Sequence, residues 1–169
     1  LGITNDDVYV FDACGRGEIP ILSKSGLSSL ASAKFKSQFN DLYTRTQNIL
    51  KRATDGRWMT LPVPYSDNAS FLACGIPAVA ITLLPAEEAS LYARKINSDK
   101  SLEDAVMNRE SSKQKRLAEN IPDFSYKEHL PYTWRLFHTQ NDNIDSLTPA
   151  SFKVMESILK SLAESKTPC

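Results

Sequence analysis

Two residues of the sequence are of a type that can do chemistry, and each stands where an apolar run gives way to polar residues. Asp12 follows the run at 8–11, and His138 follows the run at 134–137. An acid at the end of a strand is a turn former or a ligand, and a histidine at such a point can serve as a ligand or a catalytic group. A lone histidine is more often a structural or solvated side chain, so the case depends on the elements that position it.

The segment around His138 predicts a strand, a polar loop and a helix. Residues 134–137 form a short apolar run, and the Asn and Asp residues at 141–143 favour turns because their side chains bond the nearby backbone. Thr148 suits a helix N-cap. The apolar residues that then recur at helical spacing are Phe152, Met155, Ile158, Leu159 and Leu162. His138 is therefore expected at the end of a strand, at the rim of an α/β sheet where ligands collect.

Apolar runs elsewhere predict three further strands. The β-branched and aromatic run at 8–11 is typical of a strand covered on both faces, and Gly15 and Gly17 mark a sharp turn after it. Residues 19–22 favour a short strand. Residues 78–84 favour a fully buried strand that ends at a proline.

Helical patterns lie between these strands. After residues 23–26 we expect a long helix with one broad apolar face, and Asp55 and Gly56 end it, since glycine is the usual residue past a helix end. Prolines keep the extended segment 58–64 out of the centre of a sheet. A short helix with a glycine exit is expected to begin near Asp67.

The chain is expected to form a single domain over residues 1–169, with a helical insertion at about 86–133 that serves as a lid or an interface. The basic stretch 111–116 in this insertion is interpreted as solvated. The alternation of strands and helices predicts an α/β three-layer sandwich, with a mostly parallel sheet flanked by helices. About three or four strands are few for such a sheet, which indicates that N-terminal strands are missing.

The composition excludes several classes of partner. Twenty basic and twenty acidic residues give a formal net charge of zero, so no attraction to nucleic acid is expected. No apolar run reaches the length of a membrane span, and 41% hydrophobic residues is typical of a soluble globular protein. The chain starts at Leu1 without a signal-like segment, so we expect a processed or partial chain whose location, secreted or periplasmic among others, stays open.

The three cysteines match neither a disulfide framework nor a zinc knuckle. Cys14 and Cys74 lie in apolar sequence and are interpreted as buried thiols.

Three ordered motifs resemble the zinc exopeptidases with two co-catalytic metals, a family of aminopeptidases, carboxypeptidases of the glutamate carboxypeptidase type and glutaminyl cyclases. Residues 66–71 read Ser-Asp-Asn-Ala-Ser-Phe, residues 75–77 read Gly-Ile-Pro, and residues 138–142 read His-Thr-Gln-Asn-Asp. The family pattern is Ser-Asp-His-x-x-Phe, then Gly-Ile-Pro, then His-Thr-x-x-Asp. The strand that runs into Asp12 and a glycine turn also fits this family.

The resemblance implies that Asp12 is a carboxylate ligand of one zinc ion and that His138 is the imidazole ligand of the other. Asp142 is then either an acid that hydrogen-bonds a zinc ligand or a turn former that fixes the loop. Asp67 is a helix cap at the border of the substrate cleft. Asn68 stands where the family has a histidine. The implied reaction is hydrolysis of peptide bonds at chain ends, by a water molecule that two zinc ions activate.

The resemblance places the remaining zinc ligands and the general base upstream of this chain, because in the family they precede the strand that matches residues 8–11. It implies the C-terminal portion of a zinc metallopeptidase that is inactive when isolated. Its expected partners are a peptide substrate and either the N-terminal half or a second copy. Glu87 and Glu88 stand in the wrong order to replace the family's Glu-Glu pair, and they are interpreted as charges that favour a helix N-terminus.

Other hypotheses stay open. A half-domain descended from this family would serve as a non-catalytic binding or structural module, with residues 86–133 as its interaction surface. A cysteine hydrolase that uses Cys14 or Cys74 with a histidine has no supporting motif. The motifs are shared by aminopeptidases, carboxypeptidases and cyclases, and we adopt aminopeptidase as the commonest member. Neither the substrate side chain nor the oligomeric state is predicted.

Overall fold

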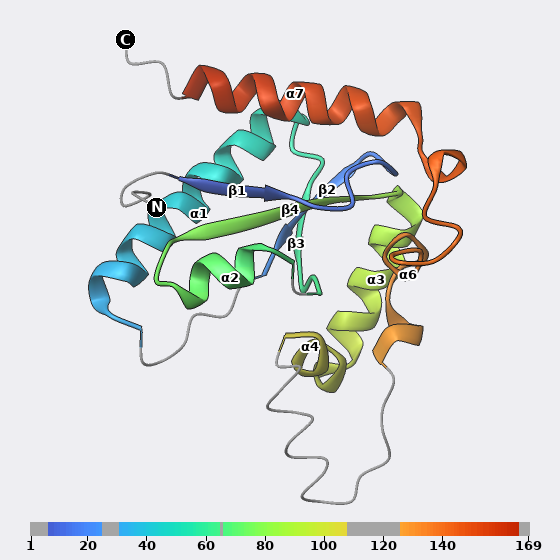
Figure 1. Ribbon diagram of the computed structural model, residues 1–169, viewed down its shortest axis with the longest axis horizontal. Coiled ribbons are helices and arrows are strands. Elements are labelled where there is room, and N and C mark those ends of the chain that lie inside the picture. Colours follow the sequence, from blue (N-terminus) through green and yellow to red (C-terminus); the bar gives the residue numbers. More distant parts are fainter. Residues whose placement is uncertain (1–6, 25–30, 65, 108–125, 166–169) are drawn as a thin grey trace, which may run out of the picture.

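A computed structural model gives the fold and describes residues 7–24, 31–64, 66–107 and 126–165. The N-terminal elements are β1 (Val8–Phe11), β2 (Ile19–Ser23), α1 (Ala33–Ala53), β3 (Met59–Leu61), α2 (Asn68–Ala73) and β4 (Ala78–Leu84). They are followed by α3 (Ala86–Ser98), α4 (Lys100–Met107), η1 (Tyr126–His129), α6 (Tyr132–Arg135), η2 (Ile144–Ser146) and α7 (Pro149–Ser165). Strands and helices alternate, which confirms the α/β class (Figure 1).

The described strands form one mixed sheet in the order β1-β4-β2-β3. β1 is parallel to β4 and β2 is parallel to β3, but β2 is antiparallel to β4, with Ile19 opposite Leu84. The sheet is therefore mixed rather than mostly parallel. The reason is the short connection from β1 to β2, because a parallel crossover needs a dozen or more residues and a short turn reverses the chain.

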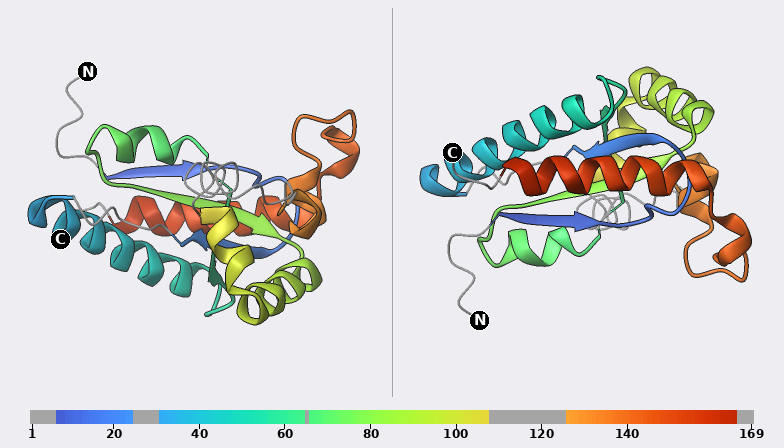
Figure 2. Two further views of the ribbon diagram at one scale, coloured as in Figure 1. Left: turned by 90° about the horizontal axis from the view of Figure 1, so that it is seen from below. Right: turned by 90° about the horizontal axis from the view of Figure 1, so that it is seen from above.

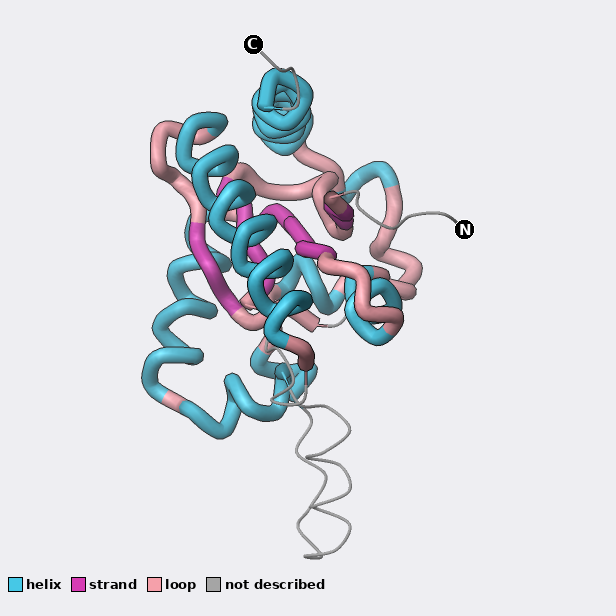
Figure 3. The backbone as a smooth tube through the Cα atoms, turned by 90° about the vertical axis from the view of Figure 1, so that its left-hand side faces the viewer, coloured by secondary structure: helices cyan, strands magenta, loops and turns pink. Residues whose placement is uncertain are grey.

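Helices cover both faces of the sheet (Figures 2 and 3). Side chains alternate along β2, so Leu22 joins a cluster with Ile158 of α7 and with residues of α1, which lies beside α7. Ile21 joins the other cluster, with Tyr92 of α3 and Trp134 of α6. The sheet and its flanking helices thus agree with the layered arrangement that the sequence predicted.

Several predicted elements are confirmed. β4 is buried along its whole length, and β3 lies at the edge of the sheet, as its flanking prolines require. α1 ends at Ala53, and Asp55 and Gly56 follow with φ of 51° and 80°. α2 begins at Asn68, and Gly75, just past its C-terminal end, has φ of 72°.

The predicted strand at 134–137 is wrong. Its first half, Trp134 and Arg135, belongs to α6, which follows Pro131, and the chain then turns through His138. Trp134 and Leu136 are buried through a helical turn instead of a strand. A short apolar run has no periodicity that separates the two structures, so packing decides between them.

Three details of packing also differ from expectation. β1 is half-buried rather than covered on both faces, because it is an edge strand. Phe152 and Leu159 are 59% and 49% exposed, since they flank the buried face of α7 that Ile158 occupies. α1 begins only at Ala33, after Ser32, whose hydroxyl accepts a cap hydrogen bond.

The described part of the insertion at 86–133 contributes to the core. Tyr92 and Ile96 of α3 and Leu102 and Val106 of α4 are buried in the cluster around Trp134. Residues 108–125, which include the basic stretch, lie outside the described residues. The role of the insertion as a lid or an interface stays a prediction.

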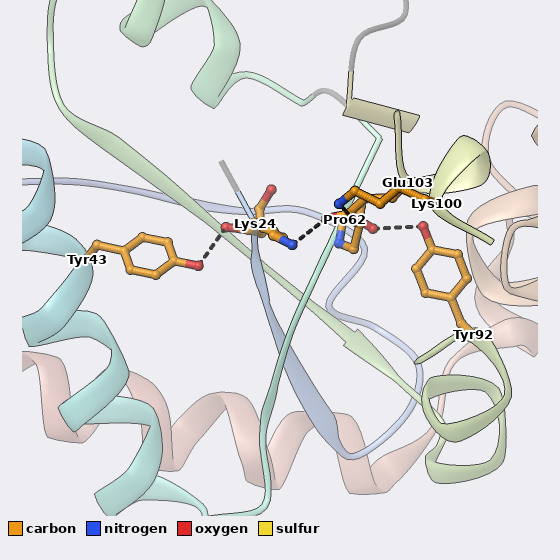
Figure 4. A network of polar contacts seen from close by, with 7 residues as sticks. Lys24, Tyr43, Pro62, Tyr92, Lys100 and Glu103 are labelled. Atoms are coloured by element: carbon orange, nitrogen blue, oxygen red, sulfur yellow. Dashed lines mark hydrogen bonds and ion pairs between the residues drawn. The ribbon is translucent and has the colours of Figure 1, made fainter. Parts of the chain in front are cut away.

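A polar network fastens α3 and α4 to the sheet (Figure 4). Glu103 is only 7% exposed and binds the ammonium groups of Lys24, which follows β2, and of Lys100. Hydrogen bonds from Lys100 and then from Lys24 hold the pKa of Glu103 below its usual range. The Tyr92 hydroxyl donates to the carbonyl of Pro62 at 2.9 Å. These contacts are structural and lie apart from the residues predicted to bind metal.

None of the helices in the described ranges combines the length and the apolarity that a membrane crossing requires.

Candidate functional site

A cleft of about 560 Å³ lies beside the carboxyl ends of β1 and β4. Its polar lining includes Asp12, Asp67, His138 and Asp142, which come from three separate segments of the chain. These are four of the five residues that the sequence singled out. Their side chains are exposed in the cleft, so they are open to a ligand. Aromatic and aliphatic residues, among them Trp134 and Phe137, form the rest of the wall.

Asn68, the fifth residue, is not part of the lining. It is 5% exposed, and its side-chain oxygen accepts a hydrogen bond from the Ser66 hydroxyl at 3.3 Å. Asp67 precedes α2 but makes no side-chain cap hydrogen bond, so the predicted capping role is wrong. The reason is its helical backbone (φ −55°, ψ −21°), whereas a capping side chain needs an extended one.

Residues 8–17, here termed the Asp12 arm, are fixed by the backbone. The amide of Asp12 donates to the carbonyl of Ile81 at 3.1 Å, which continues the contact between β1 and β4. Ala13 then takes a left-handed conformation with φ of 53°. Gly17 has φ of 96°, and a Cβ there would lie 2.1 Å from the carbonyl carbon of Leu84, so only glycine fits.

The start of α7 holds this turn from the other side. Thr148 donates its amide to the carbonyl of Gly15 at 2.9 Å and accepts from the amide of Gly17 at 3.0 Å. The Ser151 hydroxyl also donates to the carbonyl of Gly15, at 2.8 Å. Thr148, predicted only as a helix cap, therefore stabilises the turn that follows Asp12 through two hydrogen bonds.

Residues 132–142, here termed the His138 arm, consist of α6 and two tight turns. The amide and the hydroxyl of Thr139 donate to the carbonyl of Leu136 at 3.0 and 2.6 Å. His138 is the third residue of this turn, with φ of 59°, and not the end of a strand. The amide of Asp142 donates to the carbonyl of Thr139 at 3.1 Å, which matches the turn-forming role expected of Asp142.

Backbone strain is concentrated in the cleft. Among the described residues, Ala13, Asp55 and His138 are the non-glycine residues with positive φ, and Ala13 and His138 line the cleft. Each costs about 1–2 kcal/mol relative to an ordinary conformation. Asp55 belongs to the end of α1, where such geometry is common. Strain that persists at a cleft is a mark of functional sites, and no sequence signal indicated it at Ala13.

Glu88 anchors the His138 arm at its start. One carboxylate oxygen accepts from the amide of Thr133 at 2.8 Å, and the other lies 3.8 Å from Nε of Arg16. Glu88 does lie in the first turn of α3, as expected of a charge that favours a helix N-terminus. Its contact with α6 was not predicted from the sequence. Neither Glu87 nor Glu88 lines the cleft.

Trp134 anchors the same arm from inside the core. Its ring packs edge-on against Tyr92, with centroids 5.2 Å apart. Its indole N–H donates to the Thr82 hydroxyl at 3.2 Å. Sequence reasoning missed Thr82, although the one signal was present: it is the polar residue of the otherwise apolar β4.

Cys14 and Cys74, the cysteines within the described ranges, do not support nucleophilic catalysis. Cys14 is half-buried, its thiol donates to the carbonyl of Ile81 at 3.4 Å, and burial raises its pKa to about 12. It is therefore a protonated thiol at neutral pH. Cys74 is exposed, so its interpretation as a buried thiol is wrong. It stands at the C-cap of the short helix α2, where the chain leaves the core. Neither cysteine lines the cleft.

The donor atoms of Asp12 and His138 suit zinc, but they make up only part of a ligand set. Within the described ranges, no three or more His, Cys, Asp or Glu side chains are grouped so that they could hold a metal ion. A zinc site in a protein takes three or four protein ligands, so further ligands would have to come from outside the described residues. Comparisons with protein-family models, with curated proteins and with solved structures found no match to this chain.

Proposed function

We propose that this chain is the C-terminal portion of a zinc metallopeptidase of the aminopeptidase type, in which Asp12 and His138 are zinc ligands. The gathering of Asp12, Asp67, His138 and Asp142 in one cleft carries this proposal. Left-handed backbone at Ala13 and His138 supports it, because strain of this kind collects at functional sites. The order of the three motifs along the sequence supports it independently.

The charge of the cleft favours a cationic ligand. Three aspartates line it, and its lining, as far as the structure describes it, contains neither lysine nor arginine. A divalent metal ion and the protonated amino terminus of a peptide would both be attracted. Among the described lining residues, the carboxylate of a peptide C-terminus would meet neither a lysine nor an arginine. The lining therefore supports an aminopeptidase rather than a carboxypeptidase, and Trp134 and Phe137 suit an apolar substrate side chain.

In this proposal Asp12 and His138 bind zinc together with ligands from outside the described residues, and the general base also lies outside them. When bound, zinc would supply Lewis-acid polarisation of the scissile carbonyl and an acidified water. The two turns that carry Asp12 and His138 orient the carboxylate and the imidazole toward one cleft. Asp142 fixes the second turn through its backbone.

A non-catalytic module is the second candidate, and one observation favours it. The described residues contain no group of three side chains suited to a metal ion. A half-domain with this cleft would bind a cation or a peptide amino terminus without hydrolysing anything. It would bind such ligands equally well with and without zinc.

The test is zinc titration of the complete protein, with the N-terminal portion that this proposal requires, by calorimetry and with mass spectrometry of the dialysed samples. We compare the wild type with His138→Ala and Asp12→Ala, and with His129→Ala as the control, since His129 is the chain's other histidine and lies outside the cleft lining. The wild type and His129→Ala should bind zinc, and the other two at least about tenfold more weakly. Equal zinc affinity in all four, or no zinc binding by the wild type, would refute the metal roles.

A peptide series tests the substrate class in the same samples. A short peptide with an apolar first residue should bind the zinc-loaded chain more tightly than its N-acetylated form, because acetylation removes the positive charge that the aspartates attract. Amidation of the C-terminus should change little. The opposite pattern would point to a carboxypeptidase. Binding that ignores zinc would favour the non-catalytic module.

A further inference from the structure

Thr82 is an exception in the strand that forms the centre of the core. β4 reads Ala-Val-Ala-Ile-Thr-Leu-Leu and is buried throughout. Thr82 is 3% exposed, so its hydroxyl has left water and needs partners inside the protein. It is also one of the residues that line the cleft.

The hydroxyl of Thr82 connects the two arms of the cleft. It accepts from the indole N–H of Trp134 at 3.2 Å and donates to the carbonyl of Ala13 at 3.4 Å. A hydroxyl has one proton to donate and lone pairs to accept with, so both bonds form at once. Ala13 follows Asp12 directly, and Trp134 belongs to the helix that leads into the turn of His138.

We propose that Thr82 is a positioning residue. Its hydroxyl holds the Asp12 arm and the His138 arm in a fixed position relative to each other, so that both metal-binding side chains face one cleft. The metal-binding role of Asp12 and His138 rests on the proposed function. The hydrogen-bonded link through Thr82 does not. The link acts on two arms whose backbones are strained at Ala13 and His138, and strained backbone relaxes unless its surroundings hold it.

A purely structural role would have a different signature. If Thr82 only satisfied the indole of Trp134, its loss would lower stability and leave the geometry of Asp12 and His138 unchanged. Thr82→Val keeps the shape and removes the hydroxyl, whereas Thr82→Ser keeps the hydroxyl. Thr54→Val is the matched control, because Thr54 is only 6% exposed and its hydroxyl donates to the carbonyl of Leu50, in α1, at 2.7 Å.

The experiment is NMR spectroscopy of the full chain, following the Asp12 carboxyl carbon, the His138 ring and the Trp134 indole N–H. In Thr82→Val the indole proton should exchange faster, and the Asp12 and His138 signals should both shift. Thr82→Ser should return all three toward the wild type. Thr54→Val should lower the melting temperature and move none of them. If Thr82→Val does not fold, Trp134→Phe removes the same indole donor and should shift the Asp12 signal.

The zinc affinity of the complete protein then measures the consequence for the site. Thr82→Val should bind zinc about 10- to 100-fold more weakly, as is typical when a group behind a metal ligand is lost. Thr82→Ser and Thr54→Val should bind like the wild type. Unchanged Asp12 and His138 signals in Thr82→Val, or no recovery in Thr82→Ser, would overturn the proposal. A wild type that binds no zinc would refute the proposed function, while the NMR signals would still decide the role of Thr82.

Discussion

Asp12 and His138 line the same cleft, but different forces hold them there. The Asp12 arm follows β1 into the sheet ladder and turns through Gly15 and Gly17, where nearly every contact is made by the backbone or to it. The His138 arm pairs with no strand. It is held by side-chain contacts instead. The carboxylate of Glu88, which is far away in the sequence, binds its start, and its own Trp134 is buried in the core.

The difference predicts which substitutions should destabilise each arm. A backbone-held segment tolerates many side chains but not a Cβ where glycine allows close approach. A segment held by side chains is sensitive to truncation of its partners, even when these lie far away in the sequence and outside the cleft. Substitutions at the two kinds of anchor should therefore separate the arms.

The largest effect should come from Gly17→Ala, in the Asp12 arm. The new Cβ would meet the backbone of Leu84 at 2.1 Å, and φ of 96° is unfavourable for alanine, so the turn and the end of β4 must shift. We expect a loss of about 4 kcal/mol in unfolding free energy, measured by urea denaturation. Gly56→Ala is the control, because Gly56 has φ of 80° but nothing within 4 Å of a Cβ. It should lose only about 1 kcal/mol. Equal losses would show that the contact with Leu84 is unimportant.

Glu88→Ala should have the next largest effect, and it acts on the His138 arm. It removes the acceptor of the Thr133 amide and the ion-pair partner of Arg16, whose buried Nε makes no hydrogen bond. Leaving a buried donor unpaired costs about 1–3 kcal/mol, and hydrogen exchange of the Thr133 amide should accelerate. Glu87→Ala, in the same turn of α3, should stay within about 0.5 kcal/mol of the wild type. A Thr133 amide that stays protected in Glu88→Ala would mean that α6 is held by its apolar contacts alone.

The same contrast explains what the sequence could predict. The signals of the Asp12 arm are local: a β-branched strand, an acid at its end and glycines that mark the turn. The His138 arm has no such local sequence signal. Its apolar run 134–137 fits a strand or a buried helical turn equally well, and the choice depends on Glu88 and Thr82, which lie far away in the sequence.

The fold follows the same rule. β4 was predictable to the residue because a strand buried on both faces is a continuous apolar run. The direction of β2 was not, because it depends on the short turn after Asp12 and on β4 entering between β1 and β2. Of the site, the cleft residues Asp12, Asp67, His138 and Asp142 were found through motifs. Thr82 and the strain at Ala13 depend on tertiary contacts that no motif contains.

The smallest effect should come from His138→Gly, and it separates strain from function. Histidine at φ of 59° costs about 1–2 kcal/mol, and glycine removes that cost but loses about 0.5–1 kcal/mol of chain entropy on folding. The net result should be a gain of about 0.5 kcal/mol in unfolding free energy together with loss of zinc binding. Asp55→Gly relieves the same strain at φ of 51° outside the cleft, so it should gain as much stability and keep its zinc. If His138→Gly destabilised the chain instead, the imidazole would be contributing packing or hydrogen bonds that outweigh its strain, and the left-handed turn would be a structural feature of the His138 arm. A gain in stability coupled to loss of zinc would mean that the arm tolerates a strained histidine for the sake of the ligand it presents.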